Sequence, residues 1–508
     1  MKTRLLALAF AMTILFNSSA GANSDKLQES RRTESVVAVD PSRTLSTWEG
    51  WGSSLSWWAR AIGGTENSDF YADLIYSLKS TKGYPGLGLN IVRYNLGGGG
   101  VGQPGENKGP KLEWQMDISG YWVDGRTSDP NSNGWNWSLD SNQRAMMLMA
   151  RDRGANVFEL FSDSPMWWMN SNRSTAGSVD GRDCLEVSKR SDFATYLATV
   201  ARYAADHWGI KFSSVEPFNE PSADWWKYPV RQEGCHFERN TQQVIIPMLR
   251  KALDDVGLNE VVIAAADEND MEAALGTWNE YTASTRRTVG KVNVHGYYRG
   301  AEPYRGKGRV ALRRAVGNKR VWVSEYGEPD ASGLTMSESI VQDIRGLSPS
   351  AWVYWQPVEP DVEAYGWGMM NANYVDTSDK PNANATTPLV RINRKFFVYG
   401  QFTRFIRPGY QIIPIRDEHS IAAYDSKSNR LVVVTVNSGK ERTVNFDLSA
   451  FRKIGRIVQQ VATTTAPGNG VPDWLQHSST LSVDPTGKML RSVLHPNSIY
   501  TFVFEARR

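Results

Sequence analysis

The sequence has little of what metal, redox or nucleic-acid sites need. Its 508 residues include only two cysteines and six histidines. Neither an H-E-x-x-H pattern nor a C-x-x-C pair occurs, so the common zinc and thiol-redox motifs are missing. Lys and Arg number 57 against 54 Asp and Glu, and without a basic excess nucleic acid is not an expected partner. We therefore expect neither a metal nor another cofactor.

Long apolar runs are also scarce. The run over residues 5–16 follows a basic start and precedes the small residues Ala20, Gly21 and Ala22. This pattern predicts a secretory signal peptide over residues 1–22. The run is too short to span a bilayer comfortably, and no later stretch does better. We expect a secreted, extracellular protein that acts as a monomer away from membranes.

The two cysteines, Cys184 and Cys235, fit that compartment. An even pair in an oxidising environment predicts one disulfide between loops. The alternative, two free buried thiols, stays open.

Aromatic residues are abundant, with 19 Trp and 20 Tyr. Several Trp form doublets close to the ends of predicted strands, at residues 57–58, 167–168 and 225–226. Aromatic faces pack on the apolar C–H faces of sugar rings, and their N–H and O–H groups can bond hydroxyls. The doublets therefore indicate a carbohydrate ligand.

Strand and helix patterns alternate eight times over residues 49–395, which predicts a (β/α)8 TIM barrel. The expected strands begin in the Trp- and Gly-rich segment 48–58 and continue at 89–96, 156–163, 213–221, 261–266, 291–298, 320–327 and 351–358. Most are rich in apolar residues, as strands covered on both faces must be. A long loop at 101–140 follows the second strand and is expected to shape a binding cleft.

From residue 396 to 508 the helical periodicity disappears, and short alternating strands are separated by turn residues. This pattern predicts an antiparallel β-sandwich side domain. A weakly alternating strand within residues 35–48 is expected to pair into it, so that both chain ends build one module.

Two glutamates stand at the ends of predicted barrel strands. Glu220 lies between Asn219 and Pro221, and Glu325 lies between Ser324 and Tyr326, just before Gly327. In a barrel of this kind the chemistry sits at the C-terminal ends of the strands. Two carboxyl groups facing each other there are what a retaining glycoside hydrolase requires. A solvated charge at a strand end is the alternative for either glutamate alone.

Four further polar residues accompany this pair in the prediction. Asn219 could bond a sugar hydroxyl, and Tyr297 could orient the nucleophile. Arg93 lies inside an apolar strand, where it either forms a structural ion pair or supports the charge of the glutamates. His295 is expected to be a buried barrel histidine and not a catalytic base.

The chain resembles glycoside hydrolase family 30, a group of retaining enzymes. The likeness rests on Asn219-Glu220-Pro221, on Ser324-Glu325-Tyr326, on the segment 164–168 and on the sandwich built from both termini. The resemblance implies Glu220 as acid/base and Glu325 as nucleophile. It also implies, by matched position, that the pocket contains Arg93, Trp167, Asn219, Tyr297 and Trp355.

Within that family, residues 50–59 together with 93–99 look like the endo-β-1,6-galactanases. This likeness implies a polysaccharide substrate, the β-1,6-galactan side chains of arabinogalactan, and adds Trp58 and Asn95 to the expected substrate-binding residues. The alternatives are a β-1,6-glucanase, a glucuronoxylanase or a glucosylceramidase-type enzyme on the same scaffold, and a non-catalytic carbohydrate-binding protein.

Overall fold

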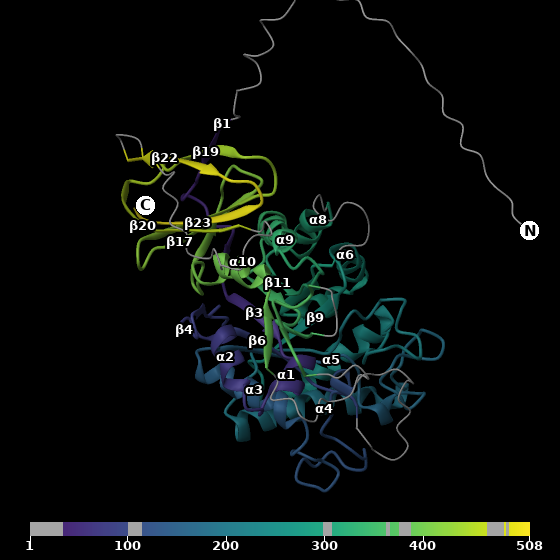
Figure 1. The fold of residues 1–508 in the computed structure, drawn as a ribbon. Helices are drawn as coiled ribbons and strands as arrows, with labels where there is room; N and C mark the ends of the chain where they lie inside the picture. The colour runs from purple at the N-terminus through teal and green to yellow at the C-terminus, as the bar shows by residue number, and fades with distance from the viewer. Residues whose placement is uncertain are drawn as a thin grey trace, which may run out of the picture.

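The computed structural model describes residues 34–99, 114–297, 307–361, 366–374, 388–464, 482–483 and 487–508 (Figure 1). The predicted signal peptide at residues 1–22 lies outside the described residues. The same holds for residues 100–113 of the long predicted loop and for residue 298 of the sixth predicted strand.

Within this part of the chain, eight parallel strands close into a barrel, as the alternating pattern predicted. They follow the chain in order around the barrel: β3 (Gly50–Ser54), β6 (Ile91–Asn95), β7 (Val157–Phe161), β8 (Ser214–Glu216), β9 (Val262–Glu268), β10 (Lys291–His295), β11 (Arg320–Glu325) and β12 (Ala351–Tyr354). Pairing of β12 with β3 closes the ring. Nearly every barrel-strand residue is buried, because side chains fill the interior and helices cover the outside.

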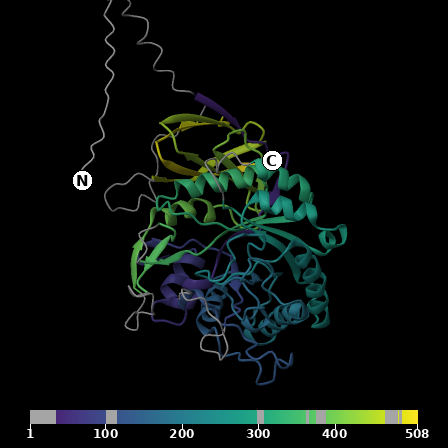
Figure 2. The same ribbon diagram turned by 90° about the vertical axis from the view of Figure 1, so that its right-hand side faces the viewer.

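Helices surround this barrel (Figures 1 and 2). They are α1 (Ser56–Ile62), α2 (Ser68–Tyr76), α3 (Ser141–Asp152), α4 (Arg190–Tyr203), α5 (Arg239–Asp255), α6 (Met271–Glu280), α7 (Ala283–Thr288), α8 (Lys307–Val316) and α9 (Leu334–Gly346). None of the helices in the described chain combines the length and the apolar character that crossing a membrane requires.

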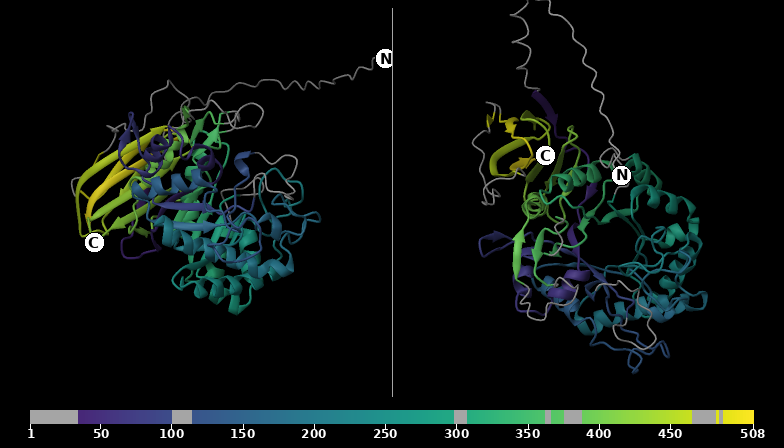
Figure 3. Two further views of the ribbon diagram at one scale, coloured as in Figure 1. Left: turned by 90° about the horizontal axis from the view of Figure 1, so that it is seen from below. Right: turned by 45° about the vertical axis from the view of Figure 1, so that its right-hand side comes forward.

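Two sheets form the β-sandwich beside the barrel (Figure 3). One contains β1 (Glu34–Ala38), β19 (Arg442–Asp447), β22 (Met489–Leu494) and β21 (Ser482–Val483). The other contains β2 (Ser46–Thr47), β16 (Gln411–Ile413), β17 (Ser420–Asp425), β18 (Arg430–Asn437), β23 (Ser498–Arg507) and β20 (Lys453–Thr464). The early strand β1 pairs in parallel with β19, so both ends of the described chain enter this module.

The junction between the barrel and the β-sandwich differs from the prediction. Helix α10 (Arg394–Thr403) occupies the start of the segment expected to be all-β, and it contacts β20 and β23. Every residue from Lys395 to Thr403 is buried. A helix that is buried all round has no polar face, so its sequence shows no amphipathic period. The helix was missed for that reason.

Small sheets complete the loops. β4 (Ser80–Thr81) pairs with β5 (Tyr84–Pro85) between α2 and β6. After β12, the strands β13 (Val358–Pro360), β14 (Met370–Ala372) and β15 (Leu389–Ile392) form a three-stranded sheet. This second sheet holds one wall of the cavity described next.

Candidate active site

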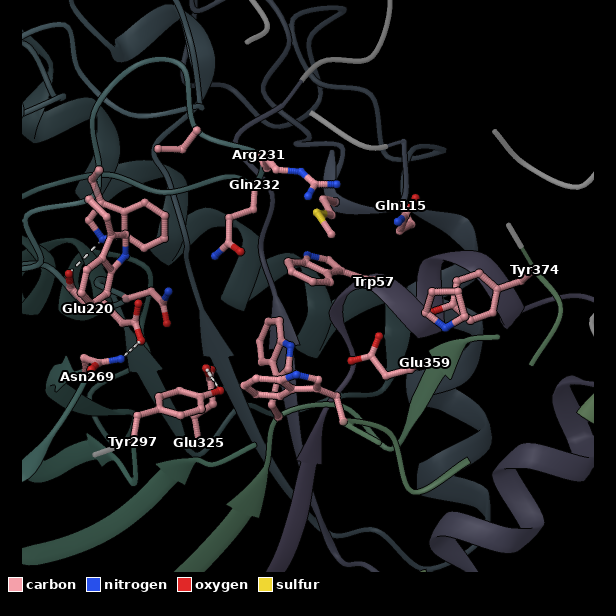
Figure 4. Close-up of a pocket in the computed structure, with 18 residues that line it drawn as sticks. Trp57, Gln115, Glu220, Arg231, Gln232, Asn269, Tyr297, Glu325, Glu359 and Tyr374 are labelled. Carbon is pink, nitrogen blue, oxygen red and sulfur yellow. Dashed lines mark hydrogen bonds between the residues drawn. The ribbon is translucent and has the colours of Figure 1, made fainter. Parts of the chain in front are cut away.

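A cavity of about 620 Å³ opens at the C-terminal ends of the barrel strands (Figure 4). Aromatic and polar side chains line it together: Trp57, Gln115, Met116, Asn219, Glu220, Trp225, Trp226, Val230, Arg231, Gln232, Asn269, Tyr297, Glu325, Trp355, Glu359, Pro360, Trp367 and Tyr374. The size and the mixture of flat apolar faces with convergent polar groups suit a sugar ligand.

Glu220 enters this cavity from the segment that follows β8. The strand ends at Glu216, because Pro217 has no N–H for the ladder. The prediction had placed the end five residues later, at Pro221. Glu220 adopts a left-handed backbone conformation with φ +47°, which is strained for a residue with a side chain. Its N–H donates to the carbonyl of Asp267 (2.9 Å), and its carbonyl accepts from Trp226 Nε1 (2.9 Å).

Glu325 is the last residue of β11, and its carboxylate is held from two sides. Tyr297 donates its hydroxyl to Oε1 (3.0 Å), and Arg93 Nη1 donates to Oε2 (3.3 Å). Burial, and next the charges of Glu220 and Asp267, raise the pKa of Glu325 to about 7 against the opposing pull of His295 and Arg93. Burial also raises the pKa of Tyr297 well above its usual value, so this hydroxyl remains a donor.

The two carboxyl groups face each other. One oxygen of Glu220, one oxygen of Glu325 and a ring nitrogen of His295 all lie within 4.8 Å of one another. Retaining glycosidases separate their carboxyl groups by about 5–5.5 Å, whereas inverting enzymes need about 6.5–9.5 Å to admit a water molecule. The geometry therefore fits retention.

His295 lies between three carboxylates and is fully buried. Its Nδ1 is 3.2 Å from Glu220 Oε1 and 3.4 Å from Glu325 Oε1, and its Nε2 is 3.2 Å from Asp267 Oδ2. Burial acts to lower the pKa of His295, but the charges of Glu325 and Asp267 outweigh it and raise this pKa well above its usual value. The imidazole is thus a cation with a proton on each nitrogen, and it offers Nδ1–H to both glutamates.

Replacing His295 by Asn should therefore move the pH profile of kcat/KM. The imidazolium favours the ionised form of Glu325, so its loss raises the pKa of Glu325 above about 7. A lost opposite charge at this distance corresponds to a shift of about 1–3 pH units. The acidic limb of kcat/KM should move to higher pH by that amount, so that activity falls most on the acidic side. His419→Asn, in the sandwich, is the matched control. An acidic limb that does not move in His295→Asn would contradict the role of His295 as a cation that stabilises ionised Glu325.

Arg93 contacts the carboxylates of this site from the interior of the barrel. Its guanidinium contacts Glu159 (3.0 Å) and Asp267 (2.5 Å) as well as Glu325, and all these groups are buried. Burial acts to lower the pKa of Arg93, but the carboxylates, with Asp267 first, outweigh it and raise this pKa. Arg93 consequently both forms structural ion pairs and supports the negative charge of Glu325. It does not line the cavity, so the structure does not place it in contact with substrate.

The cluster Glu220, His295 and Glu325 has a spacing that could also hold a metal ion. The chemistry of the donors favours a proton instead. A metal needs a neutral imidazole nitrogen, whereas both nitrogens of His295 face carboxylates that hold it in the charged form. The Arg93 guanidinium beside Glu325 further disfavours a second cation.

Several predicted residues meet in this cavity. Asn219, Tyr297 and Trp355 line it together with the two glutamates. Asn219 Oδ1 is buried and has no hydrogen-bond partner among the described residues, so it is available to a sugar hydroxyl. Trp355 packs edge-to-face against Trp57, with ring centroids 5.3 Å apart.

Three other predicted substrate contacts do not reach the cavity. Trp58 is fully buried in the core, and its Nε1 donates to Ser54 O. Its neighbour Trp57 lines the cavity instead, because adjacent residues of helix α1 point in different directions. Asn95 is buried and donates to Asp163 Oδ2 (2.7 Å). Trp167, in a 3-10 turn after β7, is not among the lining residues.

The tip of β9 supplies residues that the sequence interpretation missed. Asp267 pairs with both Arg93 and His295, which outweigh the effect of burial and lower its pKa. Asn269 donates to Glu220 Oε1 (2.6 Å). The run Asp267-Glu268-Asn269 at a predicted strand tip was the available signal, since polar residues at this end of a barrel point toward the chemistry.

The predicted disulfide is not formed. Cys184 and Cys235 are both buried free thiols. They nevertheless lie against each other: burial, followed by the interaction with Cys184, raises the pKa of Cys235 well above its usual value. The prediction was right about proximity and wrong about the covalent bond, because sequence spacing specifies neither sulfur geometry nor redox state.

Known proteins share sequence similarity with most of this chain. The model of "O-Glycosyl hydrolase family 30" matches residues 34–285. An endo-beta-1,6-galactanase from Hypocrea rufa is 41% identical over 448 residues, which span 86% of this chain and 89% of that protein.

Two solved structures share the fold. A conserved exported protein from Bacteroides fragilis superposes with a TM-score of 0.74 at 18% identity, covering 92% of this chain and all of that one. The catalytic domain of the GH30 xylanase C from Talaromyces cellulolyticus gives a TM-score of 0.66, also at 18% identity, covering 92% of this chain and 100% of its own. At such identities these likenesses bear on the fold alone, and they confirm the predicted barrel with its side domain.

Proposed function

Because the chain belongs to O-glycosyl hydrolase family 30, we propose that it hydrolyses internal β-1,6-galactosyl linkages with retention of configuration. The observation that carries the chemistry is the facing pair Glu220 and Glu325, in which one carboxylate oxygen of each lies within 4.8 Å of the other. The 41% identity to an endo-beta-1,6-galactanase over most of both chains supports the proposed substrate.

The first half of the reaction forms a glycosyl-enzyme ester. Glu325 attacks the anomeric carbon while Glu220 gives its proton to the departing glycosidic oxygen. Tyr297 and Arg93 keep the attacking carboxylate oriented through the contacts described above. The second half reverses the proton transfer: Glu220 takes a proton from water, which attacks the anomeric carbon and releases Glu325.

His295 suits this cycle because it faces both carboxylates. Negative charge resides on Glu325 before the first step and on Glu220 once the ester has formed. The imidazolium Nδ1 is 3.4 Å from Glu325 Oε1 and 3.2 Å from Glu220 Oε1. One fixed cation can therefore stabilise whichever carboxylate is ionised, without moving.

The aromatic walls suggest how a galactan chain would bind. Trp57, Trp225, Trp355 and Trp367 all line the cavity, and Trp57 packs against Trp355. Several flat rings in one cavity with the glutamates support binding of more than one sugar unit, as an endo-acting enzyme requires. The proposal includes a secreted monomer acting on arabinogalactan side chains. Secretion rests on the sequence pattern at residues 1–22, and the substrate rests on the resemblance of residues 50–59 and 93–99 to the endo-β-1,6-galactanases.

Product analysis on a set of polysaccharides tests this function. We expect release of short β-1,6-galacto-oligosaccharides from de-arabinosylated arabinogalactan, with newly formed reducing ends in the β configuration by NMR at early times. A β-1,6-glucan and a glucuronoxylan serve as competing substrates. Faster release of gluco- or xylo-oligosaccharides would assign the chain to another specificity, and α-configured products would contradict retention.

A further inference from the structure

A second cavity, of about 260 Å³, lies where the sandwich meets the flank of the barrel. The barrel contributes Leu78, Ser80 and Pro85, from the segment between α2 and β6 (Figure 1). This segment leads into the N-terminal end of a barrel strand, so the cavity lies toward the end of the barrel opposite Glu220 and Glu325. The remaining walls come from the end of α10, the turn after it, and strands β18, β20 and β23.

Three arginines line this cavity: Arg404, Arg407 and Arg430. Arg407 is half-buried, and only its Nη1 is engaged, donating to the carbonyls of Gly88 (2.7 Å) and Thr403 (2.7 Å). Burial, and next the charge of Arg404, lower the pKa of Arg407 to about 10. It remains a cation at neutral pH, held beside another cation.

Ion pairs with carboxylates are missing at two of these arginines. Over the described part of the chain, neither Arg407 nor the exposed Arg430 forms an ion pair with Asp or Glu, although Asp425 and Glu505 lie opposite Arg430 on the neighbouring strands. Asp425 is near Tyr410 at the rim, but it accepts hydrogen bonds from Ser428 and the Lys427 N–H. A partly buried cation without a counter-ion is costly, and an anion from outside would offset that cost.

The rest of the wall is apolar, with a few polar groups. Val432, Val503 and Val458 lie beside Leu78, which is 45% exposed. Gln459 and Ser80 add hydrogen-bonding groups. A bare phosphate or sulfate would make no contact with the apolar part of the wall that stabilises it. A sugar ring with one apolar face, several hydroxyls and a carboxylate matches the apolar wall, the hydrogen-bonding groups and the arginines together.

We infer that this cavity is a second binding site for a uronic acid residue of the polysaccharide, with the sugar carboxylate facing Arg407 and Arg430. The inference rests on the proposed function, since it assigns the ligand to a branch of the same substrate. Guanidinium groups bind carboxylates through paired, charge-assisted hydrogen bonds. Because the site is remote from the glutamates, it would hold a polymer while another part of the chain reaches the catalytic cavity, which raises the effective substrate concentration there.

Binding to an inactive protein tests the inference directly. In a Glu325→Gln background, with the catalytic cavity saturated by β-1,6-galacto-oligosaccharides, affinity is measured for a uronate-bearing arabinogalactan and for the same polymer after carboxyl reduction. A lost charge-assisted hydrogen bond corresponds to about tenfold in affinity or more. We expect carboxyl reduction to weaken binding about tenfold. Arg430→Glu should do the same for the native polymer and change little for the reduced one.

Arg452→Glu, an exposed charge reversal elsewhere in the sandwich, is the matched control and should bind as the parent does. Arg430→Gln replaces Arg430→Glu if the latter does not fold. Equal weakening of native and reduced polymer, or no difference between the Arg430 and Arg452 variants, would overturn the inference.

Glucuronate and inorganic phosphate, each used as a competitor, separate a sugar site from a general anion site. Glucuronate should displace the polymer at lower concentration, and equal displacement by phosphate would overturn the assignment to a sugar. Failure of the wild-type protein to hydrolyse β-1,6-galactan would instead reject the proposed function, so the two failures are distinguishable.

Discussion

With Glu325 changed to Gln, turnover of β-1,6-galactan is expected to fall by more than about 10⁴-fold, which corresponds to more than about 5.5 kcal/mol of transition-state stabilisation. The amide cannot form the glycosyl-enzyme ester, so the double displacement loses its first step. The fold should survive, because Gln has the same shape and can still accept from Tyr297 at 3.0 Å. Kinetics on galactan, with a thermal melt of the same sample, measure both quantities.

Glu359→Gln provides the matched control for this variant. Glu359 is another carboxylate of the same cavity, but it lies outside the cluster of Glu220, His295 and Glu325. Its replacement should change KM more than kcat. Chemical rescue adds a second readout: Glu325→Ala supplied with azide should yield the α-glycosyl azide, because azide then attacks from the face that Glu325 occupied. Wild-type-like turnover by Glu325→Gln would refute the role of nucleophile.

The Glu220→Gln variant should behave in a different way, because the acid is needed only when the leaving group requires a proton. On galactan, whose leaving group is an alkoxide, we expect a loss of about 10²–10⁴-fold. On an aryl glycoside whose phenol departs as a stable anion, glycosylation of Glu325 should proceed at close to the normal rate. The glycosyl-enzyme should then accumulate, visible as a burst of phenol followed by slow turnover.

Rescue chemistry again separates this role from a structural one. Azide added to Glu220→Ala should give the β-glycosyl azide, since azide needs no general base and attacks the ester with a second inversion. The comparison variant is Asn269→Ala, which removes the 2.6 Å donor to Glu220 and leaves the carboxyl group in place. If Glu220→Gln lost equal activity on galactan and on the aryl substrate, the assignment as general acid would be wrong.

Much of the barrel could be predicted because the relevant signals are local. Most barrel strands are short runs rich in apolar residues, and their ends lie close to a change to polar, Gly or Pro residues. Glu325 was placed at a strand end on that basis, and β11 indeed ends there. Glu220 was expected at the tip of its strand, but β8 stops earlier, at Glu216, and Glu220 lies in the segment that follows.

The pocket walls could not be predicted with the same success. Trp57 and Trp58 are neighbours in the sequence, but helix α1 directs one into the cavity and the other into the core. Which of them faces the sugar depends on the rotation of α1 about its axis, which packing against α3 and the barrel determines. The prediction for Asn95 failed for a related reason. At the end of β6 its side-chain amide already donates hydrogen bonds to Asp163 and Ser56.

By itself, the sequence determined the order of strands and helices, the side domain built from both ends of the chain, and the position of Glu220 and Glu325 at or near strand ends. These properties depend on hydrophobic periodicity and on strand ends, which are written in contiguous residues. Only the tertiary structure decided that Arg93, Asp267, His295 and Glu325 form one charge network, since they come from four different strands. Coulomb energies depend on the distances between charges and on their removal from water. Closure of the barrel fixes both of these quantities, and no stretch of sequence contains them.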